Sequence, residues 1–505
     1  MSGIGSGVVA PIAETAVAID RDQRRLGGWL IAAALLLHLP LIFLPAVSLE
    51  FTFAGAADYF KSGDPALLQQ FFDYQANSLG MPLLGRLAEY VLPTQNMLVI
   101  LRLISACSIV LLGLGTLRMA KFLGRKDLVW ILLLLLANPL VWTYSARATA
   151  DFFPAALAFY AVSILVSSEA SRRQTIAAVL LFSLSVLLKY HALALGLFVM
   201  AAAMSSRPDR RVLHAGIWAG LTASTALALY GAVISARYGF WLTPPKFQSF
   251  HGWRATGLLN NMALYCGYLV LLCLPFSLLL PRAGVLFRRH SVAAMTLATG
   301  LFAVGYFLLG DTGELNFGPL DGRVSPAIVN GIFLVIGCGV AAPILLQPVG
   351  ESTFARRRKF FGLALIGVLV ALSLSRPAQR YLLFVIPFFL LALPPVSTRI
   401  RPLAGLVLFC FMLVNAFIGY SQWCKGNAAL EMVQQLESSG RVTLTAPGAI
   451  ESEVGEHFYG NKNADLVYEI VAGEAENSLF TVRRGWSRLA KTFSLVPLRR
   501  TPTVP

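Results

Sequence analysis

Three carboxyl side chains follow the first long apolar run of the chain. Glu50, Asp58 and Asp64 lie in the segment LEFTFAGAADYFKSGDP, immediately after the apolar residues 27–47. A carboxylate placed against a substrate can take a proton from a hydroxyl group. In a helix, Asp58 would lie about two turns beyond Glu50. Asp64 precedes Pro65, which is typical of a residue that caps the next helix. Glu50 and Asp58 are therefore the candidates for chemistry.

Two further groups of polar residues lie at the ends of apolar runs. In YSARATADFFPAAL, Arg147 and Asp151 are four residues apart and would share one face of a helix. An interfacial salt bridge explains that pair equally well. In SVLLKYHALALGL, Lys189 and His191 interrupt an apolar stretch where two runs meet. A lysine that extends to the membrane surface and a structural histidine are the alternative to a role in substrate binding.

Basic and aromatic residues also gather later in the chain. Arg376, Arg380 and Tyr381 precede an apolar run, and a guanidinium group can bind phosphate through two hydrogen bonds. In the loop at 237–254, aromatic rings alternate with basic residues, as in the aromatic belt at a membrane surface. The candidates that this loop offers for further substrate contacts are Lys246, His251 and Arg254.

The composition predicts a membrane protein. Of the 505 residues, 57% are hydrophobic and only 13% are charged, so lipid must cover much of the surface. The apolar runs have the length at which a helix crosses a bilayer. We count thirteen such runs, at residues 27–47, 97–117, 127–144, 150–168, 174–188, 190–205, 213–235, 261–280, 291–309, 326–347, 360–374, 379–396 and 402–421.

The basic residues predict how these runs are oriented. With residues 1–26 as a cytoplasmic tail, the loops on that side hold 21 Lys or Arg, against 11 on the opposite side before the C-terminal tail. Cytoplasmic loops of membrane proteins carry such an excess. Thirteen crossings that begin inside end outside, so residues 422–505 are predicted to lie beyond the outer face.

Two polar regions are expected on that outer face. In the first loop, residues 48–96, apolar side chains recur at helical spacing, which predicts amphipathic helices on the membrane surface. Residues 422–505 contain one helix-like stretch followed by the strand-like stretches GRVTLTA, DLVYEIVAG and NSLFTV, and should form a small α/β domain.

The formal charge of +16 does not indicate a nucleic-acid partner. A nucleic-acid-binding protein needs a continuous basic face, whereas the basic residues here form short clusters between apolar runs. Five of the six cysteines fall inside apolar runs, so the sequence predicts no disulfide framework.

The order of these segments resembles the GT-C glycosyltransferases that use polyprenyl-phosphate sugars. The resemblance is to the lipid A aminoarabinose transferases and the protein O-mannosyltransferases, and it covers residues 27–421. It rests on four stretches of sequence. They are Glu50 with the following AADYFKSGDP, SARATAD, LLKYHALALGL, and RYLLFVIPFFLLA. The chain departs from the family in having Glu50 alone where many members have an acidic pair, and in having Met81 before Pro82 where a lysine often stands.

The resemblance implies an all-α polytopic membrane protein of about thirteen transmembrane helices with a C-terminal α/β domain, in a bacterial inner membrane. It implies an inverting transfer of a hexosyl or pentosyl group from polyprenyl phosphate to a lipid or glycan. Glu50 would be the base, with Asp58 as second choice and Asp151 assisting. Donor phosphate would be held by Arg147, Lys189, Arg376, Arg380 and Tyr381, and His191 would contact substrate.

Other interpretations stay open at this stage. A divalent cation is possible, with Glu50 and Asp151 as its candidate ligands, although one glutamate and a distant aspartate indicate an ion only weakly. A lipid-linked sugar flippase would also need basic groups, but along a central path and with internal repeats, which are not evident by eye. An O-antigen ligase or polymerase would place its basic residues in a large late loop, whereas here the first loop is the largest.

Overall fold

The computed structural model describes most of the chain outside its middle. The described residues are 9–45, 50–75, 78–92, 94, 96–167, 169–205, 210–245, 247, 258, 261, 262, 265, 269, 353–375, 378–393, 396, 401–438, 444–445, 468–485 and 491–497. The predicted runs at 291–309 and 326–347 and most of 261–280 lie outside them. So do four predicted site residues, namely Lys246, His251, Arg254 and Arg376.

Within the described part of the chain, four helices are long and apolar enough to cross a membrane. They are Arg25–Phe43, Met97–Phe122, Arg210–Tyr238 and Ala404–Met432. Trp218, Leu221, Leu229 and Val233 on the third of these are exposed although apolar, as expected of side chains that face lipid. The chain is thus a largely helical protein with membrane-spanning helices, and the predicted total of thirteen remains untested.

The chain divides into two compact units. Unit 1 comprises residues 1–37, 107–141 and 151–411, and unit 2 comprises residues 38–106, 142–150 and 412–505. Two long helices pass from one unit to the other, α5 (Met97–Phe122) and α19 (Arg401–Ser438).

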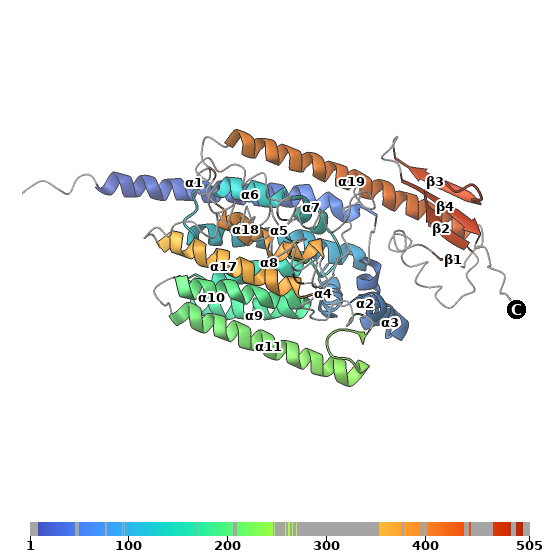
Figure 1. Cartoon of the computed structure of the whole chain (residues 1–505), viewed down its shortest axis with the longest axis horizontal. Helices are drawn as coiled ribbons and strands as arrows, with labels where there is room; N and C mark the ends of the chain where they lie inside the picture. Colours follow the sequence, from blue (N-terminus) through green and yellow to red (C-terminus); the bar gives the residue numbers. More distant parts are fainter. Residues whose placement is uncertain are drawn as a thin grey trace, which may run out of the picture. The chain divides into compact units, whose positions relative to one another are not determined.

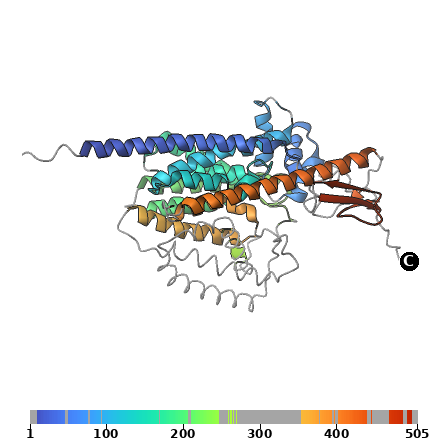
Figure 2. The same cartoon turned by 90° about the horizontal axis from the view of Figure 1, so that it is seen from above.

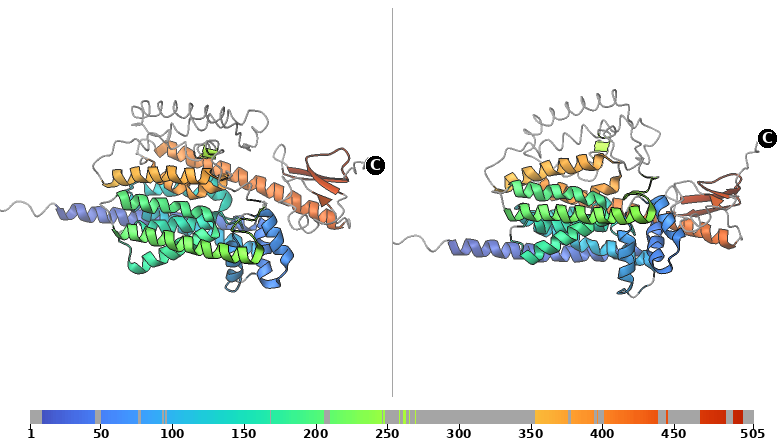
Figure 3. Two further views of the ribbon diagram at one scale, coloured as in Figure 1. Left: turned by 60° about the horizontal axis from the view of Figure 1, so that its bottom comes forward. Right: turned by 90° about the horizontal axis from the view of Figure 1, so that it is seen from below.

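Unit 1 is a bundle of helices. Besides most of α1 (Val9–His38), its elements include α6 (Leu128–Leu136), α8 (Phe152–Leu165), α9 (Arg172–Leu188), η2 (Tyr190–Leu195), α10 (Gly196–Ser205), α11 (Arg210–Tyr238), α17 (Thr353–Ser373), η5 (Gln379–Phe384) and α18 (Ile386–Ala392). Helix α9 packs on α8 and α11, and α10 packs on α17 (Figure 1). Figure 3 shows α17, α10 and α11 running nearly parallel. This packing sets the ends of α8, α9 and α17, where the candidate residues lie.

Two predicted runs are interrupted. The run at 127–144 forms α6 and then α7 (Pro139–Tyr144), because Pro139 cannot continue α6, while the Asn138 Oδ1 atom accepts a 3.0 Å hydrogen bond from Leu140 N. The run at 379–396 forms the 3-10 helix η5 and the seven-residue α18. Their apolar side chains are buried in protein, so an apolar run alone does not identify a full crossing.

The first predicted outer loop forms three helices of unit 2. They are α2 (Glu50–Ser62), α3 (Pro65–Tyr74) and α4 (Gly80–Glu89). Asp64 caps α3, since its Oδ1 atom accepts a 2.9 Å hydrogen bond from Ala66 N, which confirms that prediction. The apolar side of α3 is buried against protein, including Phe71, whereas Leu83 and Leu87 of α4 are exposed. Helix α4 therefore has an exposed apolar face.

The C-terminal part of unit 2 is a helix followed by a four-stranded sheet. Helix α19 continues without a break through the predicted boundary at residue 421 (Figure 2). The sheet has the order β1-β2-β4-β3, with β1 (Leu444–Thr445) parallel to β2 (Tyr468–Ala472), and with β4 (Lys491–Pro497) antiparallel to β2 and to β3 (Phe480–Arg484). Strand β4 is central and was not predicted. Its Phe493 and Leu495 are buried beside Val482 and Ile470.

Candidate active site

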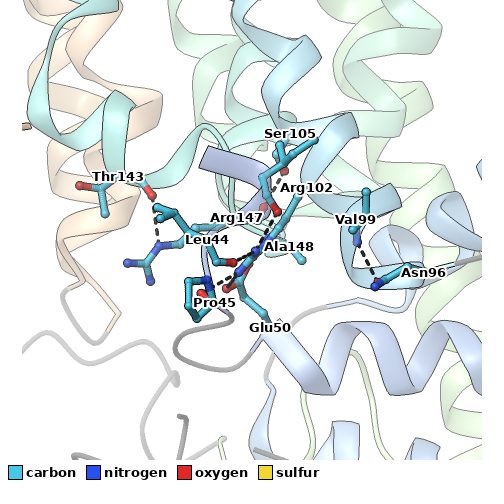
Figure 4. Close-up of polar contacts among 11 residues, drawn as sticks. Leu44, Pro45, Glu50, Asn96, Val99, Arg102, Ser105, Thr143, Arg147 and Ala148 are labelled. Atoms are coloured by element: carbon cyan, nitrogen blue, oxygen red, sulfur yellow. Dashed lines mark hydrogen bonds and ion pairs between the residues drawn. The ribbon is translucent and has the colours of Figure 1, made fainter. Parts of the chain in front are cut away.

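Glu50 forms a buried ion pair with Arg102 in unit 2 (Figure 4). The Arg102 Nε atom donates to Glu50 Oε1 at 2.8 Å, and Arg102 Nη2 donates to Glu50 Oε2 at 2.6 Å. Glu50 is fully buried and Arg102 is 3% exposed. The two parallel bonds fix the carboxylate in position as well as balancing its charge. Glu50 is also the first residue of α2, where a negative charge is favoured by the helix dipole.

Arg102 also binds the end of the first predicted run. Its Nη1 atom donates to the carbonyls of Ile42, at 3.0 Å, and Leu44, and its Nη2 atom donates to Pro45 at 3.2 Å. A guanidinium group has five N–H donors, and these contacts with the Glu50 pair use all of them. Arg102 therefore ties the end of 3-10 helix η1 (Leu39–Phe43) to the start of α2.

A third donor to Glu50 comes from the SARATAD segment. The backbone N–H of Ala148 donates to Glu50 Oε1 at 2.7 Å. Helix α7 ends at Tyr144 and α8 begins at Phe152, so Arg147 and Asp151 lie in a connection and do not share a helix face as predicted. The Arg147 Nε atom donates to Thr143 O at 3.1 Å, and its guanidinium lies 5.4 Å from the Tyr144 ring.

Asp151 contacts two cations within unit 1. Its Oδ1 atom lies 3.2 Å from Lys189 Nζ and 3.6 Å from Arg380 Nε. Asp151 precedes α8, Lys189 joins α9 to η2, and Arg380 lies in η5, so three separate helix ends supply the group. Asp151 and Lys189 are each 3% exposed, so Lys189 does not extend to a surface.

Two aromatic residues complete the same group. Lys189 Nζ lies 5.1 Å and Arg380 Cζ lies 5.8 Å from the ring centre of Tyr381, within the range of a cation–π interaction. The His191 ring is stacked on Tyr381 with the centres 4.1 Å apart. The structure thus brings together five predicted site residues, which we call the Asp151 cluster: Asp151, Lys189, His191, Arg380 and Tyr381.

Two buried polar residues hold the segment that carries Arg380. Asn261 Nδ2 donates to Ser373 O at 2.7 Å and to Ser375 O at 3.0 Å, where α17 ends. The Tyr265 hydroxyl accepts a 3.3 Å hydrogen bond from Ala378 N. These contacts satisfy backbone groups that the end of a helix leaves open. They also fix the direction in which the chain leaves α17 toward Arg380.

Asp58, the second candidate for the base, is placed differently from Glu50. Asp58 is exposed on α2, and its backbone carbonyl accepts a 3.1 Å hydrogen bond from Ser62 Oγ. Nowhere in the part of the chain that the structure describes do three His, Cys, Asp or Glu side chains gather to hold a metal ion. Of the predicted ligands, Glu50 is bound to Arg102, and Asp151 contacts Lys189 and Arg380.

Sequence reasoning missed Arg102 and Asn261 as parts of these groups. Arg102 interrupts the apolar stretch MLVILRLISACSIVLL, where a charge is costly unless it has a partner. That signal could have identified it as paired, but no sequence pattern connects it with Glu50. Asn261 sits in NNMALYCGYLV and carries no such signal, since one amide at the start of an apolar run is common.

Comparisons with known proteins found similar solved structures but no matching family model or curated protein. No protein-family model matches the chain, and no curated protein matches it. Two solved structures are similar, those of ArnT from Cupriavidus metallidurans bound to undecaprenyl phosphate and in the apo state. Their identities are 14% and 13%, and their TM-scores are 0.48 and 0.47. The alignments cover 92% of this chain and 98% of each ArnT chain. We therefore base the functional proposal on side chains of this chain.

Proposed function

We propose that the protein is an integral membrane glycosyltransferase. It takes a sugar from a polyprenyl-phosphate donor and transfers it, with inversion, to a lipid or glycan acceptor on the outer side of a bacterial inner membrane. The N-terminus is then cytoplasmic and residues 422–505 are periplasmic. The Asp151 cluster is the observation that carries this proposal.

The Asp151 cluster suits the phosphate of such a donor. Lys189 and Arg380 share one carboxylate, so the three side chains carry one net positive charge. Lys189 is nearly fully buried beside Asp151. A phosphate monoester or diester would balance that charge, and a guanidinium group suits phosphate oxygens. Arg380 is about one-third exposed, at 33%, and so can reach a ligand.

The same cations serve the chemistry. The acceptor oxygen attacks the anomeric carbon, and a new C–O bond forms as the bond from that carbon to the phosphate oxygen breaks. The polyprenyl phosphate leaves with the bonding electron pair, and the acceptor's proton passes to a carboxylate. Because phosphate is a stable anion, no acid has to protonate it. Lys189 and Arg380 stabilise the negative charge that develops on it.

Glu50 remains the proposed base, with Asp58 second. In its present position the Glu50 carboxylate is fully buried and accepts hydrogen bonds from Arg102 and Ala148. Glu50 can act as a base only when the acceptor hydroxyl reaches it. The alternative is that Glu50 positions the segment around Ala148, and the two roles predict different losses of activity in Glu50→Gln.

Transfer of a radiolabelled sugar from undecaprenyl phosphate tests the proposal directly. Purified full-length protein is mixed in lipid nanodiscs with the labelled donor and a membrane-lipid or glycan extract as acceptor. Lys189→Gln and Arg380→Gln should each raise the donor KM by at least tenfold. Arg237→Gln is the matched control, because Arg237 is exposed at the end of α11 and is predicted to lie on the same side.

The outcomes separate this proposal from its rivals. Labelled product that depends on Lys189 and Arg380 supports the transferase. Movement of intact donor across the bilayer of liposomes, with no sugar released, would instead identify a flippase. Equal donor KM values for Lys189→Gln and Arg237→Gln would refute the Asp151 cluster as the phosphate site.

A further inference from the structure

Thr149 has a buried hydroxyl group without a hydrogen-bond partner in the described part of the chain. The residue is 8% exposed, and its Oγ1 atom is shielded from solvent. A threonine within a helix can donate to a carbonyl of the preceding turn, but Thr149 lies in the connection between α7 and α8. Native proteins pair the large majority of their buried polar side-chain atoms, so an open hydroxyl at this depth indicates a bound ligand or water.

The backbone beside Thr149 is held in place by side chains of other elements. Ser105 Oγ donates to Arg147 O at 2.7 Å, and Ala148 N donates to Glu50 Oε1 at 2.7 Å (Figure 4). The Thr149 hydroxyl is therefore presented from a fixed segment of chain. A ligand that contacts it does not have to order the backbone first, which favours binding.

The hydroxyl also lies near the proposed base. Ala148 N is 2.7 Å from Glu50 Oε1, and Thr149 is the next residue along the chain. Because successive Cα atoms are about 3.8 Å apart, the Thr149 hydroxyl lies within about 10 Å of that carboxylate oxygen. A sugar or lipid headgroup with one hydroxyl at Glu50 is large enough to contact Thr149 as well.

The surroundings of Glu50 favour a neutral group over an anion. Arg102, the cation beside it, uses its five N–H donors on Glu50 and on three backbone carbonyls. The Arg147 guanidinium lies toward Thr143 and not toward Glu50 (Figure 4). Thr149 offers one hydrogen-bond donor and two acceptor lone pairs, which match those of another hydroxyl group.

We propose that Thr149 binds a neutral hydroxyl group of the sugar acceptor, beside the hydroxyl whose proton Glu50 takes. This role rests on the proposed function. It assigns acceptor binding to unit 2, whereas the donor phosphate is held by the Asp151 cluster of unit 1. Thr149 exchanges a hydrogen bond with the acceptor and takes no part in proton transfer. It thereby selects an acceptor with a second hydroxyl and orients the one that reaches the base.

Replacement of threonine by valine tests this role. Valine has nearly the shape of threonine without the hydroxyl. With labelled donor at saturation and the membrane-lipid or glycan extract diluted in series, Thr149→Val should raise the apparent acceptor KM about 2- to 10-fold, the effect of one hydrogen bond between neutral groups. The donor KM should stay unchanged. Thr149→Ser, which keeps the hydroxyl, should resemble the wild type.

The unfolding midpoint in detergent distinguishes this role from a structural one. Because the hydroxyl has no partner among the described residues, Thr149→Val should not lower the midpoint. Thr52→Val should lower it, since the buried Thr52 Oγ1 accepts a 3.0 Å hydrogen bond from Gln75 Nε2. The activity control is Thr116→Val, because Thr116 is fully buried in α5 and its hydroxyl donates to Leu112 O at 2.8 Å.

Each outcome decides the role of Thr149. A raised acceptor KM with an unchanged donor KM and midpoint supports it. Equal acceptor KM values for Thr149→Val and Thr116→Val, or a midpoint of Thr149→Val as low as that of Thr52→Val, would overturn it and identify a structural hydroxyl. A raised donor KM with an unchanged acceptor KM would overturn it as well, since the hydroxyl would then bind the donor sugar. If the wild-type protein transfers no sugar, the proposed function itself fails and this role fails with it.

Discussion

Arg102 holds Glu50 through two parallel hydrogen bonds of 2.8 and 2.6 Å in a fully buried position. The same guanidinium group binds three backbone carbonyls at the end of η1. One arginine thereby joins the first predicted crossing, the start of α2 and, through Glu50, the backbone at Ala148. This arrangement makes distinct predictions for stability and for catalysis.

Removal of Arg102 should strongly destabilise the protein. In Arg102→Ala, Glu50 becomes a buried charge without its partner, which typically costs about 3–5 kcal/mol. The matched control is Lys121→Ala, which breaks the Lys121–Glu169 pair of similar length, 2.7 Å, at the surface. Exposed pairs contribute at most about 1 kcal/mol. Thermal unfolding in detergent should show a much lower midpoint for Arg102→Ala. Equal midpoints would mean that Glu50 finds another partner.

Glu50→Gln should separate catalysis from positioning. As the base, Glu50 contributes about 10²–10⁴-fold to kcat, and Gln cannot accept the proton. We expect that loss together with a lower unfolding midpoint, since Gln still accepts the hydrogen bond from Ala148 N but leaves the buried Arg102 without a carboxylate partner. Glu50→Asp should retain part of the activity, because it keeps a carboxylate. Glu50→Gln activity within threefold of wild type would assign positioning to Glu50 and direct the search to Asp58.

Substitutions of Tyr381 should depend on its ring and not on its hydroxyl. Lys189, Arg380 and His191 all contact the ring, so Tyr381→Phe should preserve donor binding. Tyr381→Leu removes the cation–π contacts, which contribute about 0.5–2 kcal/mol, and should raise the donor KM by about 2- to 30-fold. Steady-state kinetics with varied donor provides the measurement. A large effect of Tyr381→Phe would show that the hydroxyl itself binds substrate.

Asn261 should influence donor binding through Arg380. Asn261→Ala leaves the carbonyls of Ser373 and Ser375 without their donor and releases the chain that leads to Arg380. We expect a higher donor KM with a nearly unchanged acceptor KM. Asn427→Ala is the control, because Asn427 is partly exposed and its side chain donates to Trp423 O of its own helix. A drop in kcat alone would contradict positioning of a binding residue.

Local features could be predicted from the sequence because their causes are local. The apolar runs 97–117 and 213–235 correspond to α5 and α11, since length and hydropathy are properties of one segment. Asp64 before Pro65 was predicted as a helix cap and is one. The breaks at Pro139 and between η5 and α18 were missed, because buried short helices and membrane crossings have the same apolar composition.

The ion pairs were decided by the tertiary structure alone. The sequence suggested Arg147 as the partner of Asp151 because they are four residues apart, but they lie in a nonhelical connection. Asp151 instead contacts Lys189 and Arg380, which packing of α8 and α9 and the direction of the chain after α17 bring to it. Glu50 finds Arg102 in the same way. The composition thus indicated which charged residues need partners inside a membrane protein. Only packing determined which partners they have, because the free energy of pairing depends on contacts that sequence spacing does not encode.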